Sequence, residues 1–173
     1  MSRELWLLRH AKADRNLAMD DFDRPLKKRG KRAAENLGVW MYQQGLIPDK
    51  IISSPAKRAL ATVKIVHNAL AVESIIIGQD KRLYQDGFES LKAVFTECPV
   101  EFKRVLLVGH NPALEDLLIY LVGAEHLPKI DKLIATATLV RLLVPDESLH
   151  LVAGSATLVA ITAAKSLPET AVE

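Results

Sequence analysis

The sequence predicts an α/β fold in three layers, in which helices cover both faces of a mainly parallel sheet. Short, wholly apolar runs at residues 5–8 (LWLL) and 105–108 (VLLV) are typical of strands buried on both faces. Between them, apolar residues recur at helical spacing, and strands that alternate with helices form parallel sheets. Near the C-terminus the pattern changes to two strands, at residues 137–144 and 156–162, around a turn at residues 146–148. This pair is expected to add an antiparallel strand.

The remaining elements follow in order along the chain. Residues 51–52 and 74–77 predict a second and a third short strand. Four helices are expected, and Gly45 and Leu70 mark the ends of the first two. The apolar stripes that predict these helices are Ala33, Leu37, Trp40 and Met41; Ala59, Val63 and Val66; Phe88, Leu91 and Phe95; and Leu114, Leu117, Leu118 and Leu121.

Length and composition fit a single soluble domain. We expect one domain over residues 1–165 of the 173 residues, with a loose tail at residues 166–173. No apolar run reaches the ~18 residues that span a membrane, and the charged Arg9 comes too early for a secretory signal. The lone Cys98 excludes a disulfide framework and a multi-cysteine metal site, so the cytoplasm is the expected location. A net charge of +2 and few aromatic residues do not indicate nucleic-acid binding.

Polar clusters stand at three predicted strand ends, at residues 9–10, 53–58 and 109–112. In open α/β sheets, ligands bind beyond the carboxyl ends of the strands. In the second and third clusters, Ser54 and Asn111 are expected to cap the helix that follows, with a proline at its first position. Such helix starts offer backbone N–H groups and a positive dipole end to an anion.

The side chains in these clusters suit a dianionic phosphoryl group. Arg9 and Arg58 carry guanidinium forks that bind phosphate oxygens bidentately and stay charged. Of His10 and His110, a neutral one can act as nucleophile, and the other, if protonated, can stabilise charge on the transferring group. Because the arginines neutralise the phosphate and no metal-ligand spacing such as H-E-x-x-H occurs, we expect no metal and no other cofactor.

Each of these features alone also has a purely structural interpretation. An Arg-His pair after a strand is common, Ser-Pro and Asn-Pro open many helices, and Arg58 could be a solvated helix residue. The coincidence of suitable polar groups at three strand ends is what favours an anion site.

Taken together, the motifs resemble those of the histidine phosphatases, and more closely the SixA-type phosphohistidine phosphatases. Residues 7–13 (LLRHAKA) resemble the family's opening Arg-His motif, and residues 108–112 (VGHNP) match its second histidine motif. The other matching segments are residues 23–26 with Gly30, residues 53–59 with Thr62, and residues 158–167. The matches stand in the family's order, and as a set they are highly specific.

The resemblance implies a phosphoglycerate mutase-like fold without the lid insertions of the mutases. It implies His10 as the phosphoryl acceptor, with Arg9, Arg58 and His110 as the phosphate pocket. Asn16 stands six residues after His10, where mutase-type relatives place a phosphate-contacting asparagine. Phosphate or sulfate is therefore expected in the pocket. The expected partner is a phosphohistidine-containing protein, such as a phosphotransfer or carrier domain.

The chain departs from the family pattern at four positions. Ala11 replaces the glycine of the broad Arg-His-Gly motif, as in many SixA-like chains, and Ala13 replaces a threonine that the mutases use. Lys27 stands where a Ser or Thr cap is usual, so we expect a poorer helix start. Gln85 stands where mutase-type relatives carry a catalytic glutamate, which bears on the substrate.

Three functions are consistent with these residues. The first is a phosphatase that acts through a phosphohistidine intermediate and dephosphorylates phosphohistidine on a signalling or carrier protein. The second is a phosphomonoesterase of small metabolites or of another phosphoprotein on the same fold. The third is a non-catalytic phosphate-binding module, against which the presence of both arginines and both histidines argues.

Other chemistry-bearing residues are expected to be structural or to face solvent; these are His67, His126, His150 and Cys98. Glu115 and Asp116 suit the dipole of a helix start, and Glu115 is kept as an alternative general acid. The basic run at residues 27–32 is expected to be a solvated helix face. If it docks a partner, an acidic phosphoprotein is the kind it would suit.

Overall fold

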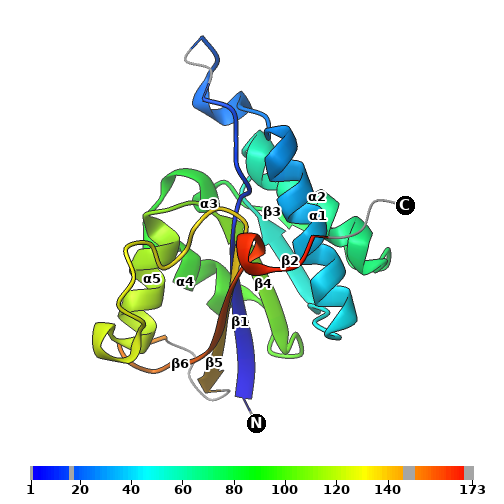
Figure 1. The fold of residues 1–173 in the computed structure, drawn as a ribbon. Helices are drawn as coiled ribbons and strands as arrows, with labels where there is room; N and C mark the ends of the chain where they lie inside the picture. Colours follow the sequence, from blue (N-terminus) through cyan, green and yellow to red (C-terminus); the bar gives the residue numbers. More distant parts are fainter. Residues whose placement is uncertain (1, 16–17, 146–150, 170–173) are drawn as a thin grey trace.

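The computed structural model describes residues 2–15, 18–145 and 151–169, and its centre is a six-stranded sheet (Figure 1). The strand order is β3-β2-β4-β1-β5-β6. Neighbouring strands from β3 to β1 pair in parallel, whereas β5 pairs antiparallel with both β1 and β6. The strands are β1 (Ser2–Arg9), β2 (Lys50–Ser53), β3 (Ile77–Gln79), β4 (Arg104–Gly109), β5 (Thr138–Pro145) and β6 (Thr157–Ala163). The predicted mainly parallel sheet with an antiparallel strand near the C-terminus is confirmed.

Helices cover both faces of the sheet, with α1 and α2 on one side and α4 and α5 on the other (Figure 1). The helices are α1 (Lys28–Gln43), α2 (Lys57–Leu70), α3 (Arg82–Gln85), α4 (Phe88–Glu97) and α5 (Ala113–Val122), with 3-10 turns η1 (Asp21–Asp23), η2 (Ala124–His126) and η3 (Ala164–Ser166). No helix of the described segments is long and apolar enough to cross a membrane.

The all-apolar strands follow from this layering. In β1, Leu5 and Leu7 pack into the core under α4 and α5, whereas Trp6 and Leu8 pack into the core under α1 and α2. Successive side chains of a strand point to opposite faces, so a strand between two helical layers needs apolar residues at every position.

Two local predictions are wrong. The third strand spans Ile77–Gln79 and not residues 74–77, because the N–H of Ile75 closes a turn onto the carbonyl of Val72. The predicted side-chain caps are also absent: α2 starts at Lys57 after an Ala56 cap, and Pro112 is itself the cap residue of α5. The expected poor start of α1 is present, since Lys27 is its N-cap without a side-chain hydrogen bond.

The end of the chain lies partly within the described residues. Leu167, in the predicted tail, packs against the core under α1 and α2. The predicted turn at residues 146–148 and residues 170–173 lie outside the described residues. The domain limits of 1–165 and 166–173 stay a prediction.

Candidate active site

The structure brings Arg9, His10, Arg58 and His110 together in one pocket of about 190 Å³. Arg9 is the last residue of β1, His110 follows β4, and Arg58 lies in the first turn of α2 after β2. These three strands are adjacent and parallel, so their carboxyl ends meet at one edge. The residues that line the pocket are Arg9, His10, Lys12, Ala13, Arg15, Arg24, Arg58, His110, Asn111 and Thr136. Asn16, the predicted phosphate contact, lies outside the described residues.

His10 is buried and has one ring nitrogen fixed. Its Nδ1 lies 2.8 Å from the carbonyl oxygen of Ala11, which accepts a hydrogen bond and therefore places the ring proton on Nδ1. Burial, followed by the charges of Arg58 and Arg9, lowers the pKa of His10 to about 4. At neutral pH the ring is uncharged, and Nε2 carries the lone pair that a nucleophile needs.

Backbone contacts hold the segment around His10. The N–H of His10 donates to the carbonyl of Gly109, and the N–H of Ala137 donates to the carbonyls of Arg9 and His10. Thr62, a residue of the family-like motif, links this segment to α2: its Oγ1 accepts from the N–H of Ala11 at 2.9 Å and donates to the carbonyl of Arg58 at 2.7 Å. The His10 segment and the helix that carries Arg58 are thus linked to each other.

His110 faces His10, with the ring centroids 5.1 Å apart. Its Nε2 lies 2.8 Å from Ser54 Oγ, which itself accepts from the N–H of Ala56. If the Ser54 hydroxyl donates to Nε2, both groups are satisfied and the ring proton sits on Nδ1, which is buried and has no partner among the described residues. Burial is the largest cause that lowers the pKa of His110, to about 3. Smaller contributions come from the positive charge of Arg58 and from repulsion between the two histidines when both are protonated. The ring is therefore neutral at neutral pH.

The sequence leads us to expect that the second histidine stabilises charge if it is protonated, whereas His110 is neutral in this structure. A bound phosphoryl dianion brings negative charge to the ring and raises its pKa. Before that, the Nδ1–H of His110 is a neutral donor available to a phosphoryl oxygen.

Both predicted arginines keep a donor free. Arg58 is 5% exposed, and its two Nη atoms donate to the carbonyl and to Oδ2 of Asp21, at 2.7 and 3.0 Å. Arg9 donates from Nη1 to the carbonyl of Ile134 at 3.2 Å. The Nε atoms of Arg9 and Arg58 are buried without a hydrogen-bond partner in the described chain, and such donors suit an oxyanion.

Asp21 and Tyr84 lie next to the pocket, in contact with Arg58 and His110 respectively. The Tyr84 hydroxyl donates to Asp21 Oδ2 at 2.8 Å, and its ring packs edge-on against His110 and Phe22. Burial alone would raise the pKa of Asp21, but the hydrogen bonds from Tyr84 and Arg58 outweigh it and lower the pKa.

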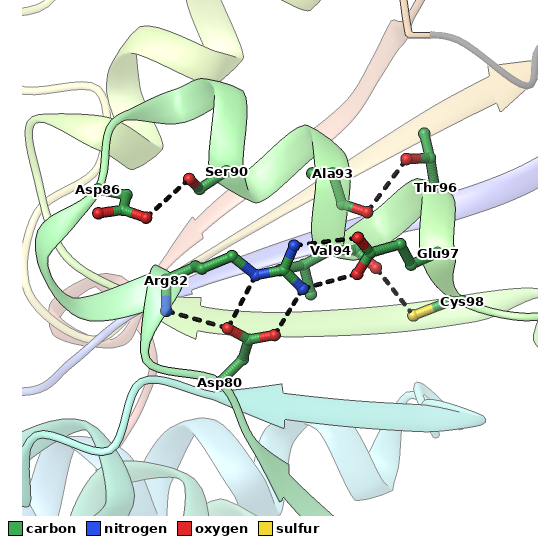
Figure 2. A network of polar contacts seen from close by, with 9 residues as sticks. All are labelled: Asp80, Arg82, Asp86, Ser90, Ala93, Val94, Thr96, Glu97 and Cys98. Carbon is green, nitrogen blue, oxygen red and sulfur yellow. Dashed lines mark hydrogen bonds and ion pairs between the residues drawn. The ribbon is translucent and has the colours of Figure 1, made fainter.

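The short helix that carries Tyr84 is fixed by an ion-pair network (Figure 2). Arg82 donates through Nε and Nη2 to Asp80, and through both Nη atoms to Glu97 of α4. The same view shows Cys98 at the end of α4, where its thiol bonds to the carbonyl of Val94. Burial raises the pKa of this thiol, which agrees with the structural role expected for it.

Several site residues were not predicted. Arg24 lines the pocket and its charge contributes to the lowered pKa of His10. Lys12 and Arg15 add two further cations. Arg24 belongs to the quoted segment of residues 23–26, which was a usable signal, whereas Asp21 depends on a loop conformation that no local pattern specifies.

Glu115, kept above as an alternative general acid, instead binds a main-chain N–H group of the loop before β5. Its Oε1 accepts from the N–H of Ile134 at 2.9 Å, and Glu115 does not line the pocket. The carbonyl of Ile134 in turn accepts from Arg9 Nη1 and from Asn111 Nδ2. Asn111 is therefore a loop anchor and not a helix cap. Gln85 is exposed and also lies outside the pocket lining.

The histidines that were assigned no catalytic role lie away from the pocket lining. His67 bonds through Nε2 to the carbonyl of Ile75, and His126 is exposed beside Glu125. His150 lies outside the described residues. Within the part of the chain that the structure describes, no three His, Cys, Asp or Glu side chains are grouped as metal ligands.

Comparison with known proteins agrees with this geometry. The sequence model of the histidine phosphatase superfamily (branch 1) matches residues 5–86. A crystal structure assigned as phosphohistidine phosphatase SixA from Agrobacterium tumefaciens superposes with a TM-score of 0.81 at 27% identity, over 94% of this chain and 99% of that one. The chain belongs to the histidine phosphatase superfamily.

Two further relatives of this histidine phosphatase are informative. The protein histidine phosphatase SixA, solved with tungstate, shares the fold with a TM-score of 0.78 at 19% identity, over 94% of this chain and 97% of that one. An uncharacterized chloroplastic protein of Arabidopsis thaliana is 40% identical over 134 residues, or 72% of this chain. The match spans 62% of the length of that plant protein.

Proposed function

We propose that this histidine phosphatase hydrolyses phosphohistidine on another protein, through a phosphoryl group carried by His10 Nε2. The observation that carries the proposal is the state of His10. It is buried and neutral, its Nδ1 is bound to the carbonyl of Ala11, and its Nε2 has no hydrogen-bond partner among the described residues. The SixA protein that was solved with tungstate, a tetrahedral oxyanion, shares this fold and is consistent with phosphate binding.

In the first step the P–N bond of the substrate breaks as a bond forms between phosphorus and His10 Nε2. The leaving group is the substrate imidazole, which departs neutral when its other nitrogen carries a proton. In the second step water attacks phospho-His10, the new P–O bond replaces the P–N bond, and the proton of water leaves with inorganic phosphate. We expect Arg9, Arg58 and the Nδ1–H of His110, whose nitrogens are buried without a partner in the described residues, to stabilise the transferring oxygens.

The substrate class depends on whether the pocket offers a general acid that can protonate the leaving group. No carboxylate is among the described residues that line it. Asp21 bonds to Arg58 beside the pocket, but its lowered pKa keeps it ionised, so it has no proton to donate. An alkyl phosphate leaves as a basic alkoxide and needs a proton from a positioned acid. An imidazole, whose conjugate acid has a pKa of about 6.5, leaves with little help. Phosphohistidine is therefore favoured over sugar phosphates, and the alternative of a small-metabolite phosphomonoesterase is disfavoured.

The test is a competition assay that offers a phosphohistidine protein and a sugar phosphate to the same preparation, with His10→Ala as control. We expect a higher kcat/KM on the phosphoprotein, a phospho-His10 adduct in mass spectra after an alkaline quench, and no turnover by His10→Ala. Near-normal activity of His10→Ala would contradict the mechanism. Phosphate or vanadate binding without turnover of any substrate would favour the non-catalytic phosphate-binding module.

We also expect activity without a metal ion. The pocket lining contributes five cations of the chain itself, which can neutralise a phosphoryl dianion; these are Arg9, Lys12, Arg15, Arg24 and Arg58. Activity should survive exhaustive chelation with EDTA. Loss of activity that a divalent ion restores would contradict this expectation.

The cytoplasm stays the predicted location of the protein.

A further inference from the structure

A second, larger cavity adjoins the catalytic pocket. It has a volume of about 460 Å³ and shares Lys12 and Thr136 with the catalytic pocket, so the two surfaces are continuous. Its walls come from the first turns of α1, from the loop before β5, and from η3 with the residues that follow. We call this cavity the basic basin; its lining residues are Lys12, Arg29, Arg32, Ala33, Asn36, Ala135, Thr136, Ala164, Lys165, Leu167 and Glu169.

The basic basin has a strong excess of positive charge. It is lined by four cations, Lys12, Arg29, Arg32 and Lys165, and by one carboxylate, Glu169, which leaves a formal charge of +3. None of the four cations forms an ion pair within the described segments. The charge of Arg15, followed by burial and the charge of Arg29, lowers the pKa of Lys12.

Helix stability does not account for the cations at the start of α1. The first turn of α1 holds no acidic residue, and the helix dipole disfavours cations at that end. The turn nevertheless packs closely against the catalytic loop. Gly30 lies so near the backbone of Lys12 that a Cβ at this position would clash with the Lys12 carbonyl oxygen. The packing thus fixes Arg29 and Arg32 beside the pocket, and a local arrangement that costs stability is typical of functional surfaces.

We infer that the basic basin binds an acidic segment of the phosphoprotein whose phosphohistidine enters the catalytic pocket. This inference rests on the function proposed above. Apolar lining from Ala33, Ala164 and Leu167 lies among the cations, so the basin offers contacts to both carboxylates and aliphatic groups. A second phosphate of a small metabolite would use only part of this cavity, whereas an acidic protein segment matches both its charge and its mixed lining.

The test uses a double charge reversal, Arg29→Glu with Arg32→Glu, and a matched control, Lys28→Glu with Lys31→Glu. Both pairs are three residues apart in the same helix and change the net charge equally, but Lys28 and Lys31 do not line the basin. Each variant is assayed on a phosphohistidine-containing phosphotransfer protein with an acidic surface, and on para-nitrophenyl phosphate, which needs the catalytic pocket alone.

For the Arg29/Arg32 pair we expect kcat/KM on the phosphoprotein to fall at least about tenfold at low salt, the lower end of electrostatic steering effects. Turnover of the aryl ester should stay within about twofold of the original, which also shows that the variant is folded. The Lys28/Lys31 pair should lose much less on the phosphoprotein. Added salt should lower the activity of the unmodified enzyme on the phosphoprotein toward that of the Arg29/Arg32 variant.

Two outcomes would overturn the inference while leaving the proposed function intact: an equal loss in both pairs, or an equal loss on both substrates. A larger loss on a small bisphosphate than on the phosphoprotein would instead assign the basin to a metabolite. An unmodified enzyme that does not hydrolyse the phosphoprotein at all would refute the proposed function itself.

Discussion

Both terminal nitrogens of Arg58 are bound by Asp21, one by its main-chain carbonyl and one by its carboxylate. The two side chains differ in exposure, at 6% for Arg58 and 56% for Asp21. An entering phosphoryl group must therefore share a fixed, buried guanidinium with a carboxylate that is largely hydrated. Asp21 can give up its contact without leaving the buried guanidinium unpaired, because the phosphoryl oxygens replace the carboxylate and Asp21 is already partly hydrated.

Replacing Asp21 with Asn should strengthen phosphate binding. The change removes a negative charge next to Arg58 but keeps an oxygen for Tyr84 and Arg58 to bind. A charge at about 4 Å is worth ~1 kcal/mol in water, so we expect inhibition by inorganic phosphate to tighten about fivefold. Asp23→Asn, an equal charge change in the same exposed turn, is the control and should have a smaller effect. Weaker phosphate binding in Asp21→Asn would mean that its charge is needed to position Arg58.

The parts of the site that depend on topology were predictable, and those that depend on loops were not. Arg9 and His110 are placed by adjacent parallel strands, so apolar patterning was enough to bring them to one edge. The contacts of Asp21 with Arg58 and of Ile134 with Glu115 each join a helix to a segment at least 19 residues away that has no periodic pattern. The helix starts at Ser54 and Asn111 were mispredicted for a related reason. Ser54 bonds to His110 as well as to the N–H of Ala56, and Asn111 bonds to the carbonyl of Ile134, so neither is the cap residue of its helix.

The buried histidines should make folding stability depend on pH. The pKa values of His10 and His110 are lowered to about 4 and about 3, below the ordinary value near 6.5 of the unfolded chain. At a pH between the lowered pKa of each histidine and its ordinary value, the unfolded chain binds more protons than the folded chain. The free energy of unfolding is therefore highest above about pH 6.5 and falls on acidification. Between pH 7 and pH 5 the loss should be about 2 kcal/mol for each histidine.

Urea unfolding at pH 7 and pH 5 measures this loss. His10→Gln should be less sensitive to acid than the original chain, whereas the exposed His126→Gln should keep the original dependence. An unchanged pH dependence in His10→Gln would show that its ring is not held neutral by burial.

Glu115 should act on Arg9 through the carbonyl of Ile134 and not as a general acid. Glu115→Ala removes the acceptor for the Ile134 N–H, and a small displacement of Arg9 should lower kcat by about tenfold or more, since misplacement by 1 Å can cost about 100-fold. Glu115→Gln keeps an acceptor oxygen and should restore most of the activity. Asp116→Ala, at the exposed neighbour, is the control. If Glu115→Gln lowered kcat as much as Glu115→Ala, and lowered it most on alkyl phosphates, Glu115 would instead be a general acid.

The absence of a carboxylate from the described pocket lining should appear in the leaving-group dependence of the reaction. Without a proton donor, charge builds up on the departing oxygen, so the rate must depend steeply on the basicity of the leaving group. For a series of aryl phosphates we expect log kcat/KM to fall steadily as the pKa of the phenol rises, and unactivated sugar phosphates to be slowest. Gln85→Glu should leave this slope unchanged, because Gln85 is exposed and outside the pocket. A flat dependence would reveal a general acid, and a slope that flattens only in Gln85→Glu would show that this position reaches the leaving group after all.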